Sequence, residues 1–215
     1  MQYLHPYQVR GNRFCLSPER CLFWEEEKAL IIADMHLGKT GHFRRSGIPV
    51  PQHIYRADLQ RLVTQLYYFR AERLIIVGDL THSSANRELD LFLRWRKDFS
   101  ALRIDLVKGN HDILAEDWYR QAEIVMCNNL EIGEFAFCHD SENRKKGHYH
   151  FSGHVHPGVT LKGKAQQSMR LPCFYFAKDF CILPAFSHFT GTYSVQPAKG
   201  ETVFAILRNR IMQVA

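Results

Sequence analysis

Residues 102–112 read LRIDLVKGNHD, a predicted buried strand over 103–107 that runs directly into Asn110, His111 and Asp112. Two earlier segments repeat this design: ALIIADMH at 29–36 and RLIIVGDLTH at 73–82. Each predicted strand ends in side chains that carry a carboxylate, an imidazole or an amide. The sequence therefore predicts three strands that deliver reactive groups at their carboxyl ends.

Helical segments connect these three strands. Between the first two, apolar residues recur at the spacing of one helix face and predict a helix over 52–69. A second helix is predicted over 86–99, with Leu89, Phe92 and Leu93 on its inner face. Alternating strands and helices indicate parallel strands with right-handed crossovers, and such sheets bind ligands beyond the carboxyl ends of their strands. The three polar clusters are therefore expected to meet.

After about Ile124 the pattern changes to short apolar runs separated by Gly, Pro, Asn and charged residues. This pattern is typical of strands with few helices. We therefore predict one α/β domain over residues 1–215, with two packed sheets and helices outside them.

The composition narrows the class of protein. The chain of 215 residues has a net charge of +6 and a pI near 9.0, which favours an acidic partner such as nucleic acid. Its six cysteines form no CxxC pair, and we expect them to be reduced thiols of a cytoplasmic protein. We expect no membrane association and no secretory signal, because no apolar stretch has the length that either requires.

Candidate metal ligands occur in five places along the chain. They are Asp34, His36, Asp79, Asn110, His111, His139, His154 and His156. A mixture of carboxylate, imidazole and amide donors suits a divalent ion such as Mn, Fe, Zn or Co. The number of donors exceeds what one tetrahedral site needs, and two metals bridged by one carboxylate would use them all.

The order of these motifs resembles the signature of the calcineurin-like metallophosphoesterases: DxH, GD, GNHD, a lone His after a strand, and GHxH. The resemblance implies a four-layer sandwich of two mixed β-sheets flanked by helices. It also implies that Asp34, His36 and His156 hold one metal. By the same resemblance Asn110, His139 and His154 would hold the other, and Asp79 would bridge the two.

The same resemblance implies roles for the two residues that follow Asn110. His111 would act as the general acid that protonates the leaving oxygen. Asp112 would hydrogen-bond to the other ring nitrogen of His111 and so orient the ring.

A longer stretch gives a closer resemblance. IIADMHLGKTGHFRRSGIPVP at 31–51, followed by GDLTHS, is similar to the bacterial ligase-associated DNA damage response endonucleases. This resemblance implies a DNA endonuclease that uses two divalent ions, with Mn expected first and Fe, Zn, Co or Mg as alternatives. It also implies a repair pathway shared with a DNA ligase and a helicase.

Basic residues beside the predicted site are candidates for substrate binding. Lys39, Arg44 and Arg45 follow the first metal motif, and His82 follows the second, where they can contact DNA phosphates. Two other functions remain open at this point. One is hydrolysis of a small or lipid-linked phosphodiester or nucleotide, which would show little dependence on salt. The other is a non-catalytic scaffold, which the intact set of ligands disfavours.

Overall fold

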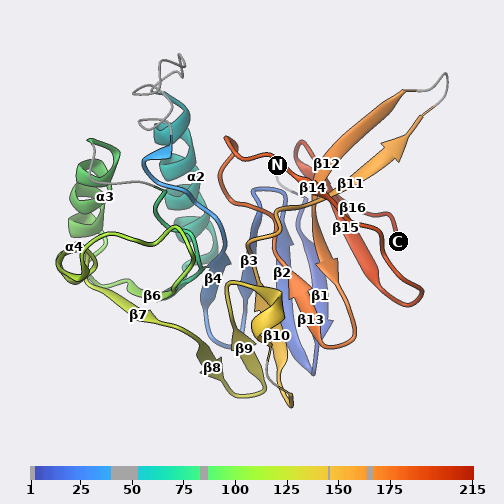
Figure 1. The fold of residues 1–215 in the computed structure, drawn as a ribbon, viewed down its shortest axis with the longest axis horizontal. Coiled ribbons are helices and arrows are strands. Elements are labelled where there is room, and N and C mark those ends of the chain that lie inside the picture. Colours follow the sequence, from blue (N-terminus) through green and yellow to red (C-terminus); the bar gives the residue numbers. More distant parts are fainter. Residues whose placement is uncertain (1–2, 40–52, 83–86, 145, 164–166) are drawn as a thin grey trace.

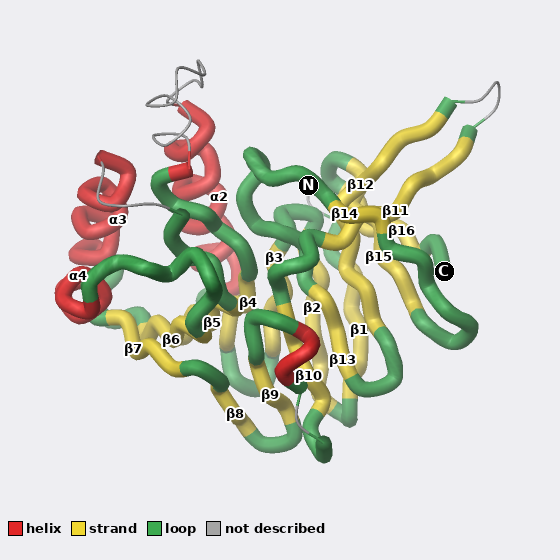
Figure 2. Tube along the Cα trace, viewed as in Figure 1, coloured by secondary structure: helices red, strands yellow, loops and turns green. Residues whose placement is uncertain are grey.

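The computed structural model describes residues 3–39, 53–82, 87–144, 146–163 and 167–215. Within them two β-sheets pack against each other, and the α-helices gather on one side of the pair (Figures 1 and 2).

The first sheet contains seven strands in chain order. They are β1 (His5–Val9), β2 (Asn12–Ser17), β3 (Cys21–Trp24), β4 (Ala29–Ile32), β5 (Arg73–Val77), β6 (Arg103–Val107) and β7 (Ile124–Cys127). Strands β1 to β4 pair antiparallel, and β4 to β7 pair parallel. The parallel arrangement predicted for the three motif-bearing strands is therefore confirmed, with β7 as a fourth member.

Crossover helices connect the parallel strands. They are α2 (His53–Phe69), α3 (Arg87–Asp98) and α4 (Glu116–Gln121). The first two lie within the helices predicted over 52–69 and 86–99, whose first residues, Gln52 and Asn86, are outside the described residues. The short α4 was not predicted.

The second sheet contains nine strands and is also mixed. In chain order they are β8 (Leu130–Ile132), β9 (Phe135–Phe137), β10 (Tyr149–Ser152), β11 (Pro157–Lys162), β12 (Ser168–Phe176), β13 (Phe180–Ile182), β14 (Tyr193–Ser194), β15 (Thr202–Leu207) and β16 (Arg210–Gln213). Strand β10 runs parallel to both of its neighbours, β9 and β13. Consequently β9 and β10 also present their carboxyl ends at a common edge.

Alternation along the strands divides the core into layers. Ala29 and Ile31 face the aromatic residues of the second sheet, such as Phe151, because successive side chains of a strand point to opposite faces. Leu30 and Ile32 point the other way and pack against the helices. Both faces of β4 are thus buried, which explains its continuous apolar sequence.

The predicted α/β class with two packed mixed sheets is confirmed. The implied layer of helices on the second outer face is absent from the described part of the chain. Short turns and the single 3-10 turn η1 (Ser141–Asn143) join most strands there. A small apolar cluster covers that face instead, in which Tyr175 and Val203 contact Val195 and Val214. None of the described helices has the length and apolar character needed to cross a membrane.

Candidate metal centre

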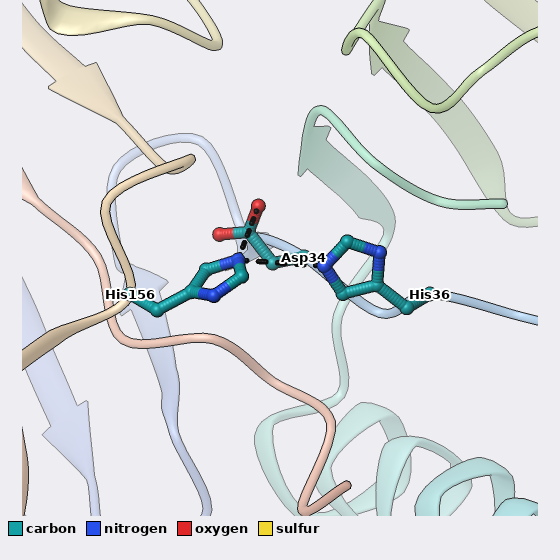
Figure 3. Close-up of side chains that lie close together, drawn as sticks. All are labelled: Asp34, His36 and His156. Carbon is teal, nitrogen blue, oxygen red and sulfur yellow. Dashed lines mark hydrogen bonds and ion pairs between the residues drawn. The ribbon is translucent and has the colours of Figure 1, made fainter. Parts of the chain in front are cut away.

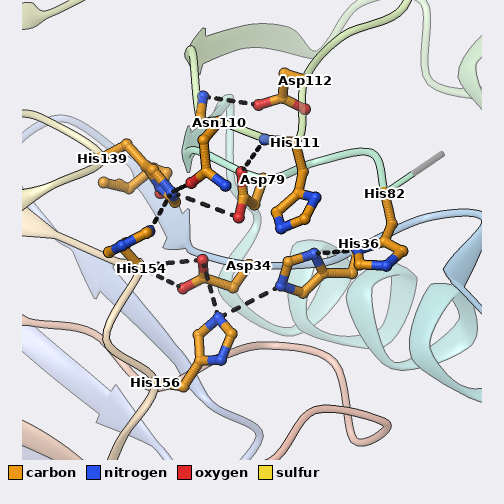
Figure 4. Close-up of polar contacts among 12 residues, drawn as sticks. Asp34, His36, Asp79, His82, Asn110, His111, Asp112, His139, His154 and His156 are labelled. Carbon is orange, nitrogen blue, oxygen red and sulfur yellow. Dashed lines mark hydrogen bonds and ion pairs between the residues drawn. The ribbon is translucent and has the colours of Figure 1, made fainter.

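The predicted ligands converge at one edge of the two sheets (Figure 4). Three strands of the first sheet contribute: β4 is followed by Asp34 and His36, β5 by Asp79, and β6 by Asn110 and His111. Two parallel strands of the second sheet contribute the rest: His139 follows β9, and His154 and His156 follow β10. The expectation that the carboxyl ends of the strands meet is therefore confirmed by the fold.

The first cluster comprises Asp34, His36 and His156 (Figure 3). The Nε2 atom of His156 lies 3.3 Å from the Asp34 carboxylate and 3.4 Å from Nε2 of His36. Asp34 and His36 are buried, whereas His156 is partly exposed. The three donor atoms therefore face one small volume that is open to solvent on one side.

The second cluster comprises Asp79, His139 and His154. The Nε2 atom of His139 lies 3.4 Å from the Asp79 carboxylate and 3.2 Å from Nδ1 of His154. Asn110 adds an amide oxygen, 3.1 Å from the same Nε2 atom. These four side chains form a second donor set beside the first.

Both clusters fit a divalent ion. Within each of them the donor atoms lie within 4.8 Å of one another, and each offers one carboxylate and two imidazoles. This mixed set suits Mn, Fe, Zn or Co. The backbone N–H of His154 donates to both oxygens of Asp34, at 3.2 Å each, and so links the two clusters. The structure therefore supports two adjacent sites for divalent metals.

Positive backbone φ angles recur at the predicted ligands. Five of them have a positive φ between 50° and 66°: Asp34, His36, Asp79, His154 and His156. Few residues other than glycine adopt this conformation, although Asp and His tolerate it better than most. Strained conformations of this kind cluster at functional sites, where the surrounding fold enforces them. The chain thus bends after each strand so that the ligands point into one space.

Two glycines of the motifs are required by close approach. A Cβ atom on Gly109 would lie 2.2 Å from Oδ1 of Asp79, and one on Gly78 would lie 1.9 Å from Nδ1 of His139. Gly78 also has a φ of 79°. Each glycine therefore makes room for a ligand from another strand, which explains why glycine precedes Asp79 and Asn110.

Neighbouring charges set the protonation of two buried histidines in opposite ways. Burial, together with the Lys39 ammonium group, lowers the pKa of His36 to about 2. Burial also opposes the charged form of His139, but its hydrogen bond to Asp79 and the Asp79 charge raise its pKa to about 9. For Asp79, burial is outweighed by its contacts with His139 and the His111 N–H, and its pKa falls to about 2. At neutral pH and without metal, His36 is neutral and the Asp79–His139 pair is ionised.

His111 lies between the clusters without belonging to either. Its backbone N–H donates to Oδ1 of Asp79 at 2.9 Å. Its ring stacks on that of His82, with centroids 4.6 Å apart, and meets the His36 ring edge-on at 5.4 Å (Figure 4). His82 in turn approaches His36, with 3.4 Å between their Nδ1 atoms. The structure therefore places both His111 and His82 at the centre.

The predicted contact of Asp112 with the ring of His111 is wrong. Asp112 is buried, and its carboxylate accepts hydrogen bonds from the backbone N–H groups of Gly109 and Thr81, both at 2.9 Å. The hydroxyl of Thr81 donates to it as well, at 3.1 Å. Because buried carboxylates need several donors, Asp112 binds the backbone of two ligand-bearing loops. It therefore shapes the site and does not orient His111.

The predicted substrate-binding residues have different outcomes. Lys39 lies beside the first cluster, and its ammonium group donates to the Thr190 hydroxyl at 3.4 Å. Arg44 and Arg45 lie outside the described residues. The prediction for these two therefore stays a prediction.

One cavity was missed by the sequence analysis. A cavity of ≈ 610 Å³ opens beside the second cluster, between His139, Asn110 and residues that follow β7. Asn128, Asn129 and Lys108 line it and offer polar groups to a ligand. The signal for these residues was present in the sequence, because Asn128 and Asn129 follow an apolar run in the same way as the other site residues.

Comparison with solved structures identifies a protein similar over the whole chain. The crystal structure of the nuclease MPE of Pseudomonas putida superposes with a TM-score of 0.85 and 30% sequence identity, covering 99% of this chain and 100% of that one. The phosphoesterase YfcE of E. coli matches with a TM-score of 0.46 and 14% identity, over 87% of this chain and 98% of that one. No protein-family model matches the chain, and no curated protein does.

Proposed function

Because the chain belongs to the calcineurin-like metallophosphoesterase superfamily, we propose that it is a metal-dependent nuclease that hydrolyses phosphodiester bonds of DNA. The observation that carries this proposal is the similarity to the nuclease MPE, which extends over 99% of the chain at 30% identity. Two donor clusters at the shared edge of the sheets support the same conclusion.

We assign the ligands by the two clusters. Asp34, His36 and His156 would hold one ion, and Asn110, His139 and His154 would hold the other. Asp79 lies beside His139 and is proposed to bridge the two ions. When bound, two such ions acidify a water and offset negative charge on the phosphate group. Of the metals that suit these donors, we propose Mn.

His111 is the proposed general acid. Hydrolysis breaks the bond between phosphorus and the leaving oxygen, which must gain a proton. The His111 ring lies at the centre but outside both donor clusters, so its nitrogens remain available to donate that proton. The His111 N–H bond to Asp79 and the stacked His82 ring hold it in place.

Basic groups around the centre are proposed to bind the phosphates that flank the cleaved bond. Lys39 and His82 lie beside the first cluster, and Lys108 borders the cavity at the second. The net charge of +6 supports a polyanionic substrate. A shared pathway with a DNA ligase and a helicase, and a cytoplasmic location, remain predictions from the sequence.

The test measures hydrolysis of bis-p-nitrophenyl phosphate and of circular and linear single-stranded DNA, each with Mn, Mg or Zn and after chelation. We expect metal-dependent hydrolysis of the small diester and of both DNAs, since a circle can be cut only by an endonuclease. His111→Ala should lower turnover by about 10²- to 10⁴-fold, the usual contribution of a general acid. His148→Ala is the matched control, because His148 lies before β10, at the opposite end of that strand from His154.

Each other outcome contradicts a stated part of the proposal. Hydrolysis of the small diester without cleavage of either DNA would favour the small-substrate phosphoesterase. If the wild-type protein hydrolyses neither the diester nor DNA with any of the metals, a non-catalytic scaffold would be favoured. Unchanged turnover in His111→Ala would remove His111 from the mechanism.

A further inference from the structure

A two-stranded ribbon extends from the metal centre. Strand β11 begins at Pro157, directly after the ligand His156, and pairs antiparallel with the first part of β12. Figure 1 shows the two strands projecting together beyond the body of the second sheet. At about 3.4 Å per residue, the six residues of β11 extend roughly 20 Å.

The pairing register gives the ribbon two different faces. Thr160 pairs with Arg170 and Lys162 with Ser168, and these four exposed side chains share one face. The opposite face carries the apolar pairs Val159–Leu171 and Leu161–Met169. Val159 packs into the small apolar cluster on the outside of the second sheet. Near the base of the ribbon, the apolar face is therefore packed against the sheet and the polar face is exposed to solvent.

The segment 187–192 connects this polar face to the metal centre. It begins beside the first cluster, where the Ser187 N–H donates to the Asp34 carbonyl oxygen at 3.3 Å. It ends at the base of the ribbon, where Arg170 donates to the Thr192 carbonyl oxygen at 3.4 Å. The next residue, Tyr193, donates its N–H to the carbonyl oxygen of His156 at 2.9 Å.

Two cations contact the second half of this segment. Lys39 contacts Thr190 from the side of the metal centre, and Arg170 contacts Thr192 from the ribbon. Lys162 lies one pair further along the same face of the ribbon. A row of positive groups and hydroxyls thus leads away from the first cluster.

The sequence of this region has an unusual charge. Residues 157–200 contain five Lys or Arg residues and one acidic residue, Asp179. Their net charge is therefore +4, out of +6 for the whole chain. Tyr193, at the base of the ribbon, is also 70% exposed, and exposed aromatic rings stack on unpaired bases.

We infer that the polar face of the β11–β12 ribbon, with the segment 187–192, binds the DNA strand that continues beyond the cleaved bond. The inference rests on the proposed nuclease function. Arg170 and Lys162 contact successive phosphates, and Tyr193 stacks on a base of the same strand. The contacts are made to the backbone and the ring faces, so they favour single-stranded DNA without selecting a sequence.

The test is the double variant Lys162→Glu/Arg170→Glu, assayed with Mn for binding of a short single-stranded oligonucleotide. The matched control is Arg94→Glu/Lys97→Glu, which changes two exposed cations of α3 by the same charge. The ribbon variant should bind at least about tenfold more weakly, and the slope of log K against log salt should lose about 1.4, the value for two phosphate contacts on a single strand. The control should bind within about twofold of wild type and keep the wild-type salt slope, since its charges lie outside the path.

Two further measurements separate a failed inference from a failed function. All variants should hydrolyse bis-p-nitrophenyl phosphate at the wild-type rate, because none of the substituted residues belongs to a donor cluster. Lys162→Gln/Arg170→Gln should give a smaller loss of DNA affinity and the same melting temperature as wild type. If wild type cuts DNA but the ribbon variant binds as the control does, the inference is overturned. If wild type hydrolyses the diester but neither binds nor cuts DNA, the proposed nuclease function is wrong, and the inference about the ribbon falls with it.

Discussion

His36 in the first cluster and His139 in the second are both buried imidazoles, yet their pKa values shift in opposite directions, to about 2 and about 9. Burial opposes the charged form of both, so the difference comes from their neighbours. Lys39 lies near His36, whereas His139 is hydrogen-bonded to the Asp79 carboxylate. In the first cluster His36 is thus ready to bind metal at neutral pH, whereas His139 in the second must first release a proton.

The largest expected effect is on how the stability of the metal-free protein depends on pH. Because the pKa of His139 is raised in the folded state, its pairing with Asp79 stabilises the fold fully below the ordinary value of 6.5. That contribution, as much as about 3 kcal/mol, is lost as pH rises through about 9. Urea unfolding of the chelated protein across this range measures it. His139→Gln should remove most of the pH dependence and His148→Gln none of it; equal dependence in both variants would refute the pairing.

The pH dependence of metal affinity should also differ between the two clusters, by almost as much. Below pH 9 a metal competes with the proton on His139, so affinity at the second cluster should fall about tenfold per pH unit, or about 100-fold from pH 8 to 6. The first cluster should show no such fall from His36, which is already neutral. Calorimetry on His156→Ala, which keeps the second donor set, and on His154→Ala, which keeps the first, tests this. If metal affinity in His154→Ala, which keeps only the first set, fell steeply with falling pH, the proton would have to be assigned to the first cluster.

A steric change can be directed at Asp79, the carboxylate that is proposed to bridge the two clusters. In Gly109→Ala the added Cβ atom must displace the Asp79 carboxylate, from which it would lie 2.2 Å. We expect a loss of about 2 kcal/mol of stability, typical of overpacking, and weaker metal binding at both clusters, because Asp79 is proposed to bridge the two ions. Gly191→Ala is the control, because nothing lies within 4 Å of the position that its new Cβ atom would take, and its φ is not positive. Thermal unfolding and metal titration of both variants test this. Equal stability and equal metal affinity in the two variants would show that Asp79 can move aside without cost.

The smallest effect should come from the cavity beside the second cluster. Asn128→Ala and Asn129→Ala each remove a polar group from its wall, and we expect KM for DNA to rise about fivefold, equivalent to about 1 kcal/mol for a lost hydrogen bond. The turnover number should stay unchanged, because neither residue belongs to a donor cluster. Steady-state kinetics with Asn209→Ala as control tests this, and a drop in turnover without a change in KM would place these residues in the chemistry.

Much of the fold was predictable because the parallel strands have strong local signals. Residues 29–33 and 74–77 are continuous apolar runs, and the helix over 52–69 has a regular apolar face. The strands β1 and β2 had no such signal. They are joined by Arg10 and Gly11, both with positive φ, and Arg-Gly is a weak marker for that turn compared with Asn-Gly. The six-residue α4 is too short to show a period.

The candidate site was predictable where the order of motifs sufficed. The structure brings together the two predicted donor sets, although their roles as ligands remain proposals. The contacts of Asp112 were not predictable, because they depend on how the loop after β5 packs against the loop after β6. Asn128 and Asn129 were missed because β7 was assigned to the second half of the chain, although it is the fourth parallel strand.

The most direct test of a two-part metal centre is anomalous diffraction from crystals grown with Mn. We predict two peaks about 3.5–4 Å apart, the usual spacing of a two-metal site. One should lie among Asp34, His36 and His156 and the other among Asn110, His139 and His154, with Asp79 between them. A single peak, or two peaks with a different division of these ligands, would contradict the proposed centre.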